Sequence, residues 1–193
     1  MIRLNDVVIQ WVRGDVAHQP DVDAVVNAAN AQLRSGGGVA GAIHRTAGPG
    51  LEAECRPLAP IRPGQAVITG GHNLPNRYVI HCLGPVYGVD EPAAELLASC
   101  YRNALQLAEE RGVQSIAFPA ISTGAFGYPL DAATRVALAT VLGHAATLAR
   151  LRCIRFVLFS DADLRVYQRV GQEVGGAWEG AQILSGVDDA GVP

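Results

Sequence analysis

The stretch AVVNAANAQLRSGGGVAGAIHRTA, residues 24–47, decides the fold class. Its first three residues form a short apolar run that predicts a buried strand, and a polar loop follows directly. Three glycines then precede a helix expected over residues 39–47, where Ala40, Ile43 and Ala47 recur at helical spacing. A strand, a glycine-bearing loop and a helix make up the repeating unit of an α/β protein.

The same alternation continues on both sides of this stretch. Residues 73–76 predict a turn between two neighbouring strands, and Gly112 is a typical helix end before the next strand. Strands are expected at residues 7–11, 66–69, 78–82, 115–119 and 154–159, and helices at 92–111, 129–149 and 163–174. Such a pattern favours a three-layer α/β/α domain whose ligand lies beyond the carboxyl ends of the strands.

Length and composition indicate one compact domain. The chain has 193 residues, of which 49% are hydrophobic and 17% charged, within the usual range of folded domains. We expect the domain to span residues 1–175. Residues 176–193 combine glycine and acidic residues with few large apolar ones, so we expect a flexible C-terminal tail.

The charge balance excludes several classes of function. Fifteen basic residues against eighteen acidic ones give a net charge of −3, which argues against a broad surface for nucleic acid or for an anionic membrane. Every basic residue is an arginine. Without lysine there is no Walker-type phosphate lysine and no Schiff base with a carbonyl substrate.

The four cysteines, at positions 55, 82, 100 and 153, form no CxxC pair, so buried free thiols are expected. The sequence predicts neither a metal site nor a cofactor. It also lacks the apolar region of a signal peptide and any apolar run of about 18 residues, so we expect a cytoplasmic protein without a membrane span.

Three loops fall at expected strand ends: residues 14–16, 27–39 and 121–127. Glycines before a helix offer free backbone N–H groups and a positive helix end, which can hold a phosphate without lysine. Ser122 and Thr123 add two hydroxyl groups. Glycine-rich turns are also common as purely structural features, and neither glycine loop fits a GxGxxG or Walker pattern.

Individual side chains in these loops allow two interpretations each. Asn27 and Asn30 are typical turn or capping residues, yet their amides could also contact a ligand. Asp15 could end a turn or accept a hydrogen bond from an exocyclic amine. Phe126 could pack internally or rest against a sugar or base. None of the five histidines sits in a convincing triad, and Ser122 lacks the GxSxG elbow, so acyl-enzyme chemistry is not expected.

Four motifs in order resemble the macrodomain family: Gly14-Asp15-Val16, the run VVNAAN at 25–30, the run GGGV at 36–39 and the run STGAFG at 122–127. The flanking runs GAIHR at 41–45, YVIH at 78–81 and AFPAI at 117–121 are most similar to the MacroD-type branch. The resemblance covers roughly residues 1–175.

This resemblance implies a mixed six- or seven-stranded sheet between helices and a cleft for ADP-ribose. It implies that Asp15, with Val16 beside it, binds the adenine amino group. Residues 36–39 and 122–126 are expected around the diphosphate and distal ribose, and Asn30 is the expected catalytic residue that holds the distal ribose. The full expected ligand set is Asp15, Val16, Asn27, Asn30, Gly36, Gly37, Gly38, Val39, Ser122, Thr123, Gly124, Ala125, Phe126 and Ser160.

Three positions depart from the MacroD-type pattern, of which Ser35, where that branch often continues the glycine run, is expected to be harmless. Ala40 stands where that branch carries the aspartate assigned to water activation, and Ser160 stands near the place of an adenine-stacking aromatic. The resemblance therefore predicts a monomeric hydrolase that removes mono-ADP-ribose from acidic residues of proteins without the usual acid, with O-acetyl-ADP-ribose as a further expected substrate. The alternatives are a non-catalytic ADP-ribose reader and a phosphatase acting on ADP-ribose 1″-phosphate.

Overall fold

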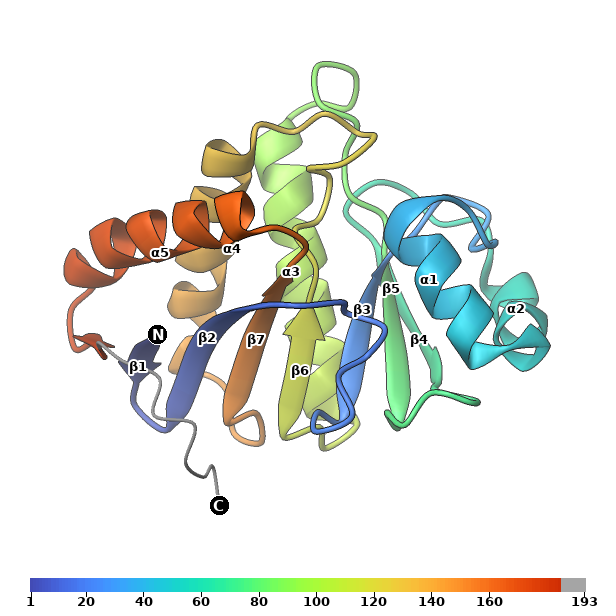
Figure 1. Ribbon diagram of the computed structural model, residues 1–193, viewed down its shortest axis with the longest axis horizontal. Helices are drawn as coiled ribbons and strands as arrows, with labels where there is room; N and C mark the ends of the chain where they lie inside the picture. The colour runs from blue at the N-terminus through green and yellow to red at the C-terminus, as the bar shows by residue number, and fades with distance from the viewer. Residues whose placement is uncertain (185–193) are drawn as a thin grey trace.

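A computed structural model describes residues 1–184. Its centre is one mixed sheet in the order β4-β5-β3-β6-β7-β2-β1-β8 (Figure 1). The strands are β1 (Ile2–Leu4), β2 (Val7–Arg13), β3 (Ala24–Ala28), β4 (Ala66–Gly70), β5 (Tyr78–Cys82), β6 (Ser115–Phe118), β7 (Cys153–Leu158) and β8 (Gln182–Ile183). The helices are α1 (Gly38–Ala47), α2 (Pro49–Cys55), α3 (Ala93–Glu110), α4 (Leu130–Ala145) and α5 (Asp161–Gly176), with a short 3₁₀ turn at Arg56–Leu58.

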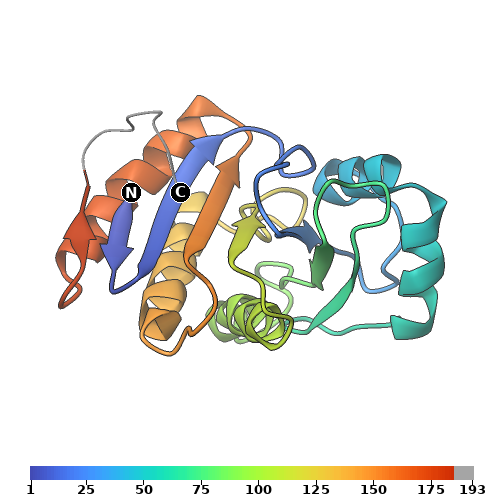
Figure 2. The ribbon, with the colours of Figure 1, turned by 90° about the horizontal axis from the view of Figure 1, so that it is seen from below.

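Alternating side chains of the central strands build two hydrophobic cores. In β3, Ala24 and Val26 belong to the core under α3, α4 and α5, whereas Val25 belongs to the core under α1 and α2. Successive side chains of a strand point to opposite faces, so one apolar strand serves both layers. Figure 2 shows the two groups of helices on opposite sides of the sheet. The predicted three-layer α/β/α architecture is confirmed.

The central five strands β5, β3, β6, β7 and β2 pair in parallel, whereas β4, β1 and β8 join antiparallel at the two edges. The expected pairing of the strands around the turn at residues 73–76 is confirmed as β4 with β5. Because the parallel strands share one direction, their carboxyl ends meet along one edge of the sheet. The loops that follow them therefore lie side by side.

The sheet has eight strands rather than the expected six or seven. The two additional short strands pair with each other, Ile2 opposite Ile183, and α2 was also not expected from the sequence. Past the expected boundary at residue 175, α5 runs to Gly176 and β8 pairs with β1. The glycines of this segment allow close packing, since a Cβ at Gly175 would lie 2.9 Å from the Ile2 side chain. The remainder of the expected tail, residues 185–193, lies outside the described residues.

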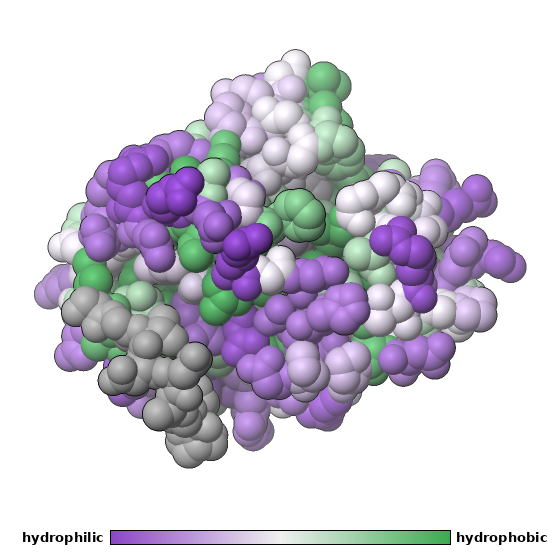
Figure 3. All heavy atoms as spheres, viewed as in Figure 1, coloured by the Kyte–Doolittle hydropathy of each residue, from purple (hydrophilic) through white to green (hydrophobic). Residues whose placement is uncertain are grey.

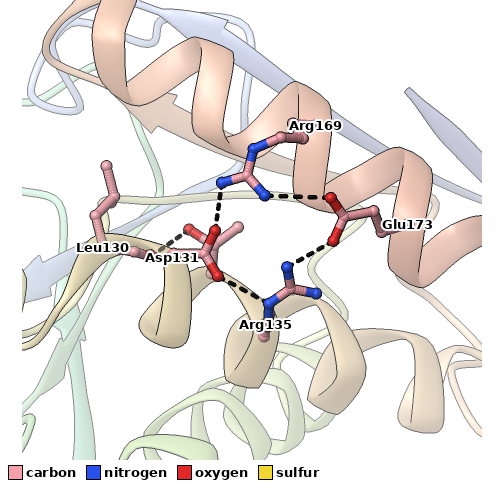
Figure 4. Close-up of polar contacts among 6 residues, drawn as sticks. Leu130, Asp131, Arg135, Arg169 and Glu173 are labelled. Atoms are coloured by element: carbon pink, nitrogen blue, oxygen red, sulfur yellow. Dashed lines mark hydrogen bonds and ion pairs between the residues drawn. The ribbon is translucent and has the colours of Figure 1, made fainter.

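Helices α4 and α5 are joined at the surface by a ring of four charged side chains (Figure 4). Asp131 and Glu173 each contact both Arg135 and Arg169, so every charge in the ring has two partners of opposite sign. These side chains are solvent-exposed, where ion pairs contribute little to stability individually. The ring links the first turns of α4 to the second half of α5.

All four cysteines are free thiols, three buried and Cys153 half-buried, as the sequence predicted. Burial raises the pKa of Cys55 to about 11 and that of Cys100 to about 12, so both stay protonated and unreactive at neutral pH. Among residues 1–184, none of the helices has the length and apolar character needed to cross a membrane.

Candidate functional site

A cavity of about 390 Å³ lies at the carboxyl ends of the central parallel strands. In the space-filling view the surface is hollowed there, with white and green residues around the hollow (Figure 3). Its volume falls within the range of small-molecule sites. The lining residues come from four segments: Ala28, Ala29, Asn30; Gly36, Gly37, Gly38, Val39, Ala40; Gly84; and Ala120, Ile121, Ser122, Gly124, Ala125, Phe126.

The first wall of the cavity is the glycine loop that opens α1. The helix begins at Gly38, no side chain caps its first N–H groups, and no acidic residue stands in its first turn. Those N–H groups and the positive helix end are free to meet an anion. A Cβ at Gly37 or at Gly38 would meet no atom within 4 Å, so the space in front of the loop is open.

The glycine loop is held on α1 by a close contact that requires a further glycine. A Cβ at Gly41 would lie 2.3 Å from the Gly36 carbonyl oxygen. Only glycine at this position of α1 leaves room for that carbonyl oxygen. The position between them, Ala40, is only 5% exposed and lines the cavity with a methyl group.

The second wall is the loop after β6. The backbone N–H of Tyr128 donates to the Ser122 carbonyl at 2.9 Å, and that of Gly127 to the Gly124 carbonyl at 3.0 Å. These bonds fold the loop tightly and leave Ser122 with a φ of 67°, a conformation that non-glycine residues adopt rarely. Unusual backbone conformations of this kind cluster at functional sites.

Only two of the cavity-lining side chains are polar, Asn30 and Ser122, and none of the lining residues is titratable. The Asn30 amide donates to the Arg34 carbonyl at 2.7 Å and accepts from the Arg34 N–H at 3.1 Å. An amide has a second N–H and a second lone pair, so Asn30 can still bind a ligand while it holds its own loop. Ser122 is 6% exposed, and its hydroxyl has no partner among the described residues.

A second group of expected residues lies further along the same sheet edge, after β2 and β7. Asp15 Oδ1 accepts from the Ala17 N–H at 2.9 Å, while Oδ2 lies 3.1 Å from His18 Nδ1. Val16 is 4% exposed and packs in the core under α1 and α2. None of these residues lines the cavity itself.

The neighbouring loop after β7 differs from the expectation for Ser160. Its hydroxyl accepts from the Asp163 N–H at 3.1 Å and so caps α5. The aromatic side chain there is Phe159, which is 87% exposed. The Gly14 N–H donates to the Leu158 carbonyl at 2.9 Å, which brings this loop beside the loop of Asp15.

Asn27 belongs to the expected ligand set but does not line the cavity. It is fully buried in β3, and its amide nitrogen lies 3.1 Å from Nδ1 of His81, its register partner on β5. Asn27 and Val25 share the sheet face under α1, whereas the cavity begins one residue later, at Ala28. Thr123 also points away, since its hydroxyl donates to the Ala120 carbonyl at 2.8 Å.

Asn27 belongs to a polar group that we call the His81 cluster, made of Asn27, Cys55, Thr69 and His81. Thr69 donates to the Gly70 carbonyl at 3.2 Å, so its oxygen accepts from His81 Nε2 at 2.9 Å. His81 Nδ1 is then left to accept from Asn27. This neutral tautomer satisfies both ring nitrogens, and desolvation by burial lowers the pKa of His81 to about 3.

Sequence reasoning missed Gly84, which lines the cavity after β5. A Cβ at Gly84 would lie 2.1 Å from Ser122 Oγ, so only glycine allows the loops after β5 and β6 to meet. The available signal was a glycine directly behind an apolar strand. Ala120 was missed, and Ala28, Ala29 and Ile121 fell in the expected loops without being named as ligand contacts, because apolar residues at strand ends carry no chemical signal.

Comparison with known proteins establishes the family. The Macro domain family matches residues 26–137, which is more than half of the chain. A macro domain-containing protein of Chlorobaculum tepidum is 49% identical over 166 residues, covering 86% of this chain and 96% of that protein. The chain belongs to the macro domain family.

Two solved structures relate this fold to ligands. The Oceanobacillus iheyensis macrodomain with ADP has a TM-score of 0.85 and 38% identity, covering 89% of this chain and 94% of its own. The Trypanosoma brucei macrodomain in complex with ADP-ribose has a TM-score of 0.77 and 41% identity, covering 83% of this chain and 68% of its own. The Oceanobacillus protein has also been solved with an aspartate replaced by alanine.

Proposed function

We propose that the cavity binds ADP-ribose. The observation that carries this proposal is the pair of glycine-bearing loops, residues 36–39 and 122–126, which face each other across about 390 Å³ and offer backbone N–H groups in place of cations. Such a site suits a diphosphate in a chain without lysine. The complexes of related macrodomains with ADP and with ADP-ribose support the same ligand.

The sheet order sets the direction of the ligand in this proposal. Asp15 and Phe159 follow β2 and β7, whereas Asn30 and Gly84 follow β3 and β5 on the other side of β6. The adenine then lies toward Asp15, where Phe159 is exposed and available for stacking. The diphosphate lies between the glycine loops, and the distal ribose reaches Asn30 and Gly84.

We further propose that the protein hydrolyses mono-ADP-ribose esters of acidic residues, and O-acetyl-ADP-ribose as a small substrate of the same chemistry. The water oxygen forms a bond to C1″ of the distal ribose, and the bond between C1″ and the carboxylate oxygen breaks with its electron pair on the departing carboxylate. The proton of the water passes to a diphosphate oxygen of the substrate and then to solvent. Asn30 holds the ribose hydroxyls in line.

An ester is the linkage that this cavity suits best. Its lining residues include no titratable side chain, and Ala40 supplies only a methyl group, so no protein acid or base can assist the leaving group there. A carboxylate departs without prior protonation, whereas an alkoxide or an amine does not. We propose cytoplasmic, monomeric action on mono-ADP-ribosylated proteins.

One observation favours a second function, that of an ADP-ribose reader without turnover. Ala40 lies in the cavity wall at the start of α1 and cannot activate water. A reader and a hydrolase would bind ADP-ribose with the same loops. Turnover with enzyme in excess separates the two.

Calorimetric titration with ADP-ribose tests the binding proposal. We expect saturable binding by the wild-type protein and at least a tenfold weaker affinity for Gly124→Val, because a side chain at this open, cavity-lining position fills ligand space without a clash in the free protein. Gly143→Ala in α4, where a Cβ meets only the Trp178 ring at 3.8 Å, is the matched control and should bind as the wild type does. Equal affinities for all three proteins would contradict the assignment of the cavity.

A further inference from the structure

Four exposed arginines belong to the segments that adjoin the ribose end of the cavity. We call them the arginine rim: Arg34, Arg45, Arg56 and Arg62. None of the four forms an ion pair within residues 1–184, whereas five arginines elsewhere do: Arg13, Arg102, Arg135, Arg155 and Arg169. The rim therefore presents guanidinium groups that the described part of the chain does not neutralise.

Backbone hydrogen bonds place Arg62 next to two cavity-lining residues. The residue before Arg62 donates its N–H to the Ala31 carbonyl at 2.9 Å, and the residue two positions after it donates to the Leu83 carbonyl at 2.8 Å. Ala31 directly follows Asn30, and Leu83 directly precedes Gly84. Because Asn30 and Gly84 line the cavity, Arg62 lies at the end assigned above to the distal ribose.

Arg34 and Arg56 share a second, smaller hollow of about 90 Å³. The Asn30 side chain is bonded to the backbone of Arg34, at 2.7 Å to its carbonyl and 3.1 Å to its N–H, so this hollow adjoins the cavity wall. Glu52 lines it too and forms no ion pair among the described residues. Two guanidinium groups at one hollow provide planar forks of N–H donors that suit carboxylates.

Arg45 lies on the side of the glycine loop. It stands in the last turn of α1, and long helical side chains point back toward the start of their helix. A Cβ at Gly41 would lie 3.0 Å from Arg45 Nη1 and 2.3 Å from the Gly36 carbonyl oxygen. The guanidinium group is therefore close to a glycine that lines the cavity.

The place of these arginines distinguishes them, and the lack of an ion pair alone does not. Arg3, Arg150 and Arg165 also have no ion pair within residues 1–184, but they lie on β1, before β7 and on α5. Residues 30–64, which contain the whole rim, include only two acids, Glu52 and Glu54. Glu54 is occupied, because one oxygen lies 2.6 Å from His72 Nε2 and both accept from a backbone N–H. The rim thus carries an excess of positive charge.

We propose that the arginine rim binds acidic side chains that flank the modified residue of a protein substrate. This inference rests on the proposed function, in which C1″ of the distal ribose joins the nucleotide to a polypeptide at this end of the cavity. The modified acid has lost its own charge in the ester, so the attraction comes from neighbouring carboxylates. The cavity lining includes no titratable side chain, so selection by charge depends on residues outside it.

The test compares two peptides that carry ADP-ribose through an amide in place of the ester, because an amine leaves poorly without an acid and the ligand stays intact. One peptide has glutamates on both sides of the attachment, and the other has glutamines. Calorimetry gives their dissociation constants, and that of free ADP-ribose, for the wild type and for a rim variant with Arg56→Gln and Arg62→Gln. The matched control variant, with Arg150→Gln and Arg165→Gln, removes two exposed charges elsewhere.

We expect the wild type to bind the glutamate-flanked peptide about fivefold more tightly at low salt, since each exposed ion pair contributes modestly. Near 0.5 M salt the preference should shrink to about twofold, because exposed charges are screened. The rim variant should lose the preference and the control variant should keep it. All three proteins should bind free ADP-ribose alike.

Four results would overturn the proposal: equal binding of both peptides by the wild type, an equal loss of preference in the control variant, weaker binding of free ADP-ribose by the rim variant, or tighter binding of an ADP-ribose polymer than of the glutamate-flanked peptide. The third would make the rim a nucleotide contact, and the fourth would assign it to a phosphate chain. If the wild type does not bind free ADP-ribose at all, the proposed function itself fails, which is a distinct result.

Discussion

Asn27 and Asn30 are three residues apart in one motif and lie in opposite environments. Asn27 is fully buried and serves the His81 cluster, where His81 has both ring nitrogens satisfied. Asn30 lines the cavity, where the second polar side chain, Ser122, has no partner within residues 1–184. The difference teaches that one strand end holds two kinds of amide: the Asn27 nitrogen is paired inside the core, whereas Asn30 keeps a second N–H and lone pair for a ligand. The buried Asn27 stabilises the sheet under α1, whereas Asn30 can contact a ligand in the cavity.

The largest expected effect is on the hydrolysis rate of a variant at Asn30. Asn30→Ala should lower the single-turnover hydrolysis rate by roughly 100- to 10,000-fold, because the ribose is no longer held in line for attack. ADP-ribose affinity should fall much less, since the backbone N–H groups of both loops remain. Rate measurements with calorimetry check this. Equal losses of rate and affinity would remove the assigned role of Asn30.

Asn27→Ala should act on stability instead. It leaves His81 Nδ1 without its only described donor, 3.1 Å away, inside the core, and an unsatisfied buried acceptor together with a small void costs about 2–3 kcal/mol. Urea denaturation measures this loss, and ADP-ribose affinity of the folded variant should be unchanged. Weakened binding with unchanged stability would show that Asn27 contacts the ligand after all.

A smaller, graded effect is expected from acid. In the unfolded chain His81 takes up a proton near its ordinary pKa of 6.5, whereas burial lowers the pKa of the folded-state imidazole to about 3. The unfolded state therefore binds more protons between these values, and stability falls as the pH falls below about 6.5, by up to about 1.4 kcal/mol per pH unit. Urea denaturation between pH 7 and 5 should show a steeper loss for the wild type than for His81→Gln. Parallel curves would mean that His81 does not titrate differently in the two states.

Much of the fold was predictable from the sequence because its signals are local. Apolar runs such as residues 24–26 and helix ends such as Gly112 need no tertiary contact to be recognised. The strand β8 was not predictable, since its two exposed residues gain their conformation only by pairing with β1. Helix α2 was missed as well, since its proline and glycine at the start resemble a turn.

The candidate site was predictable where glycines and hydroxyls mark it. The loops of residues 36–39 and 122–126 do line the cavity, with Thr123 as the exception. The opposite fates of Asn27 and Asn30 were not predictable, because they depend on strand register opposite His81 and on where β3 ends. The role of Gly84 needed the distance to Ser122, which joins segments 38 residues apart.

The measurement that tests the central claim most directly is a time course of ADP-ribose release from a glutamate-mono-ADP-ribosylated protein, with this protein in molar excess. The account predicts release above the spontaneous rate by a cavity whose lining residues include no acid or base, and loss of that release in Asn30→Ala. Release at the spontaneous rate, with ADP-ribose still bound, would contradict hydrolysis and make the protein a reader, with Ala40 as the physical reason.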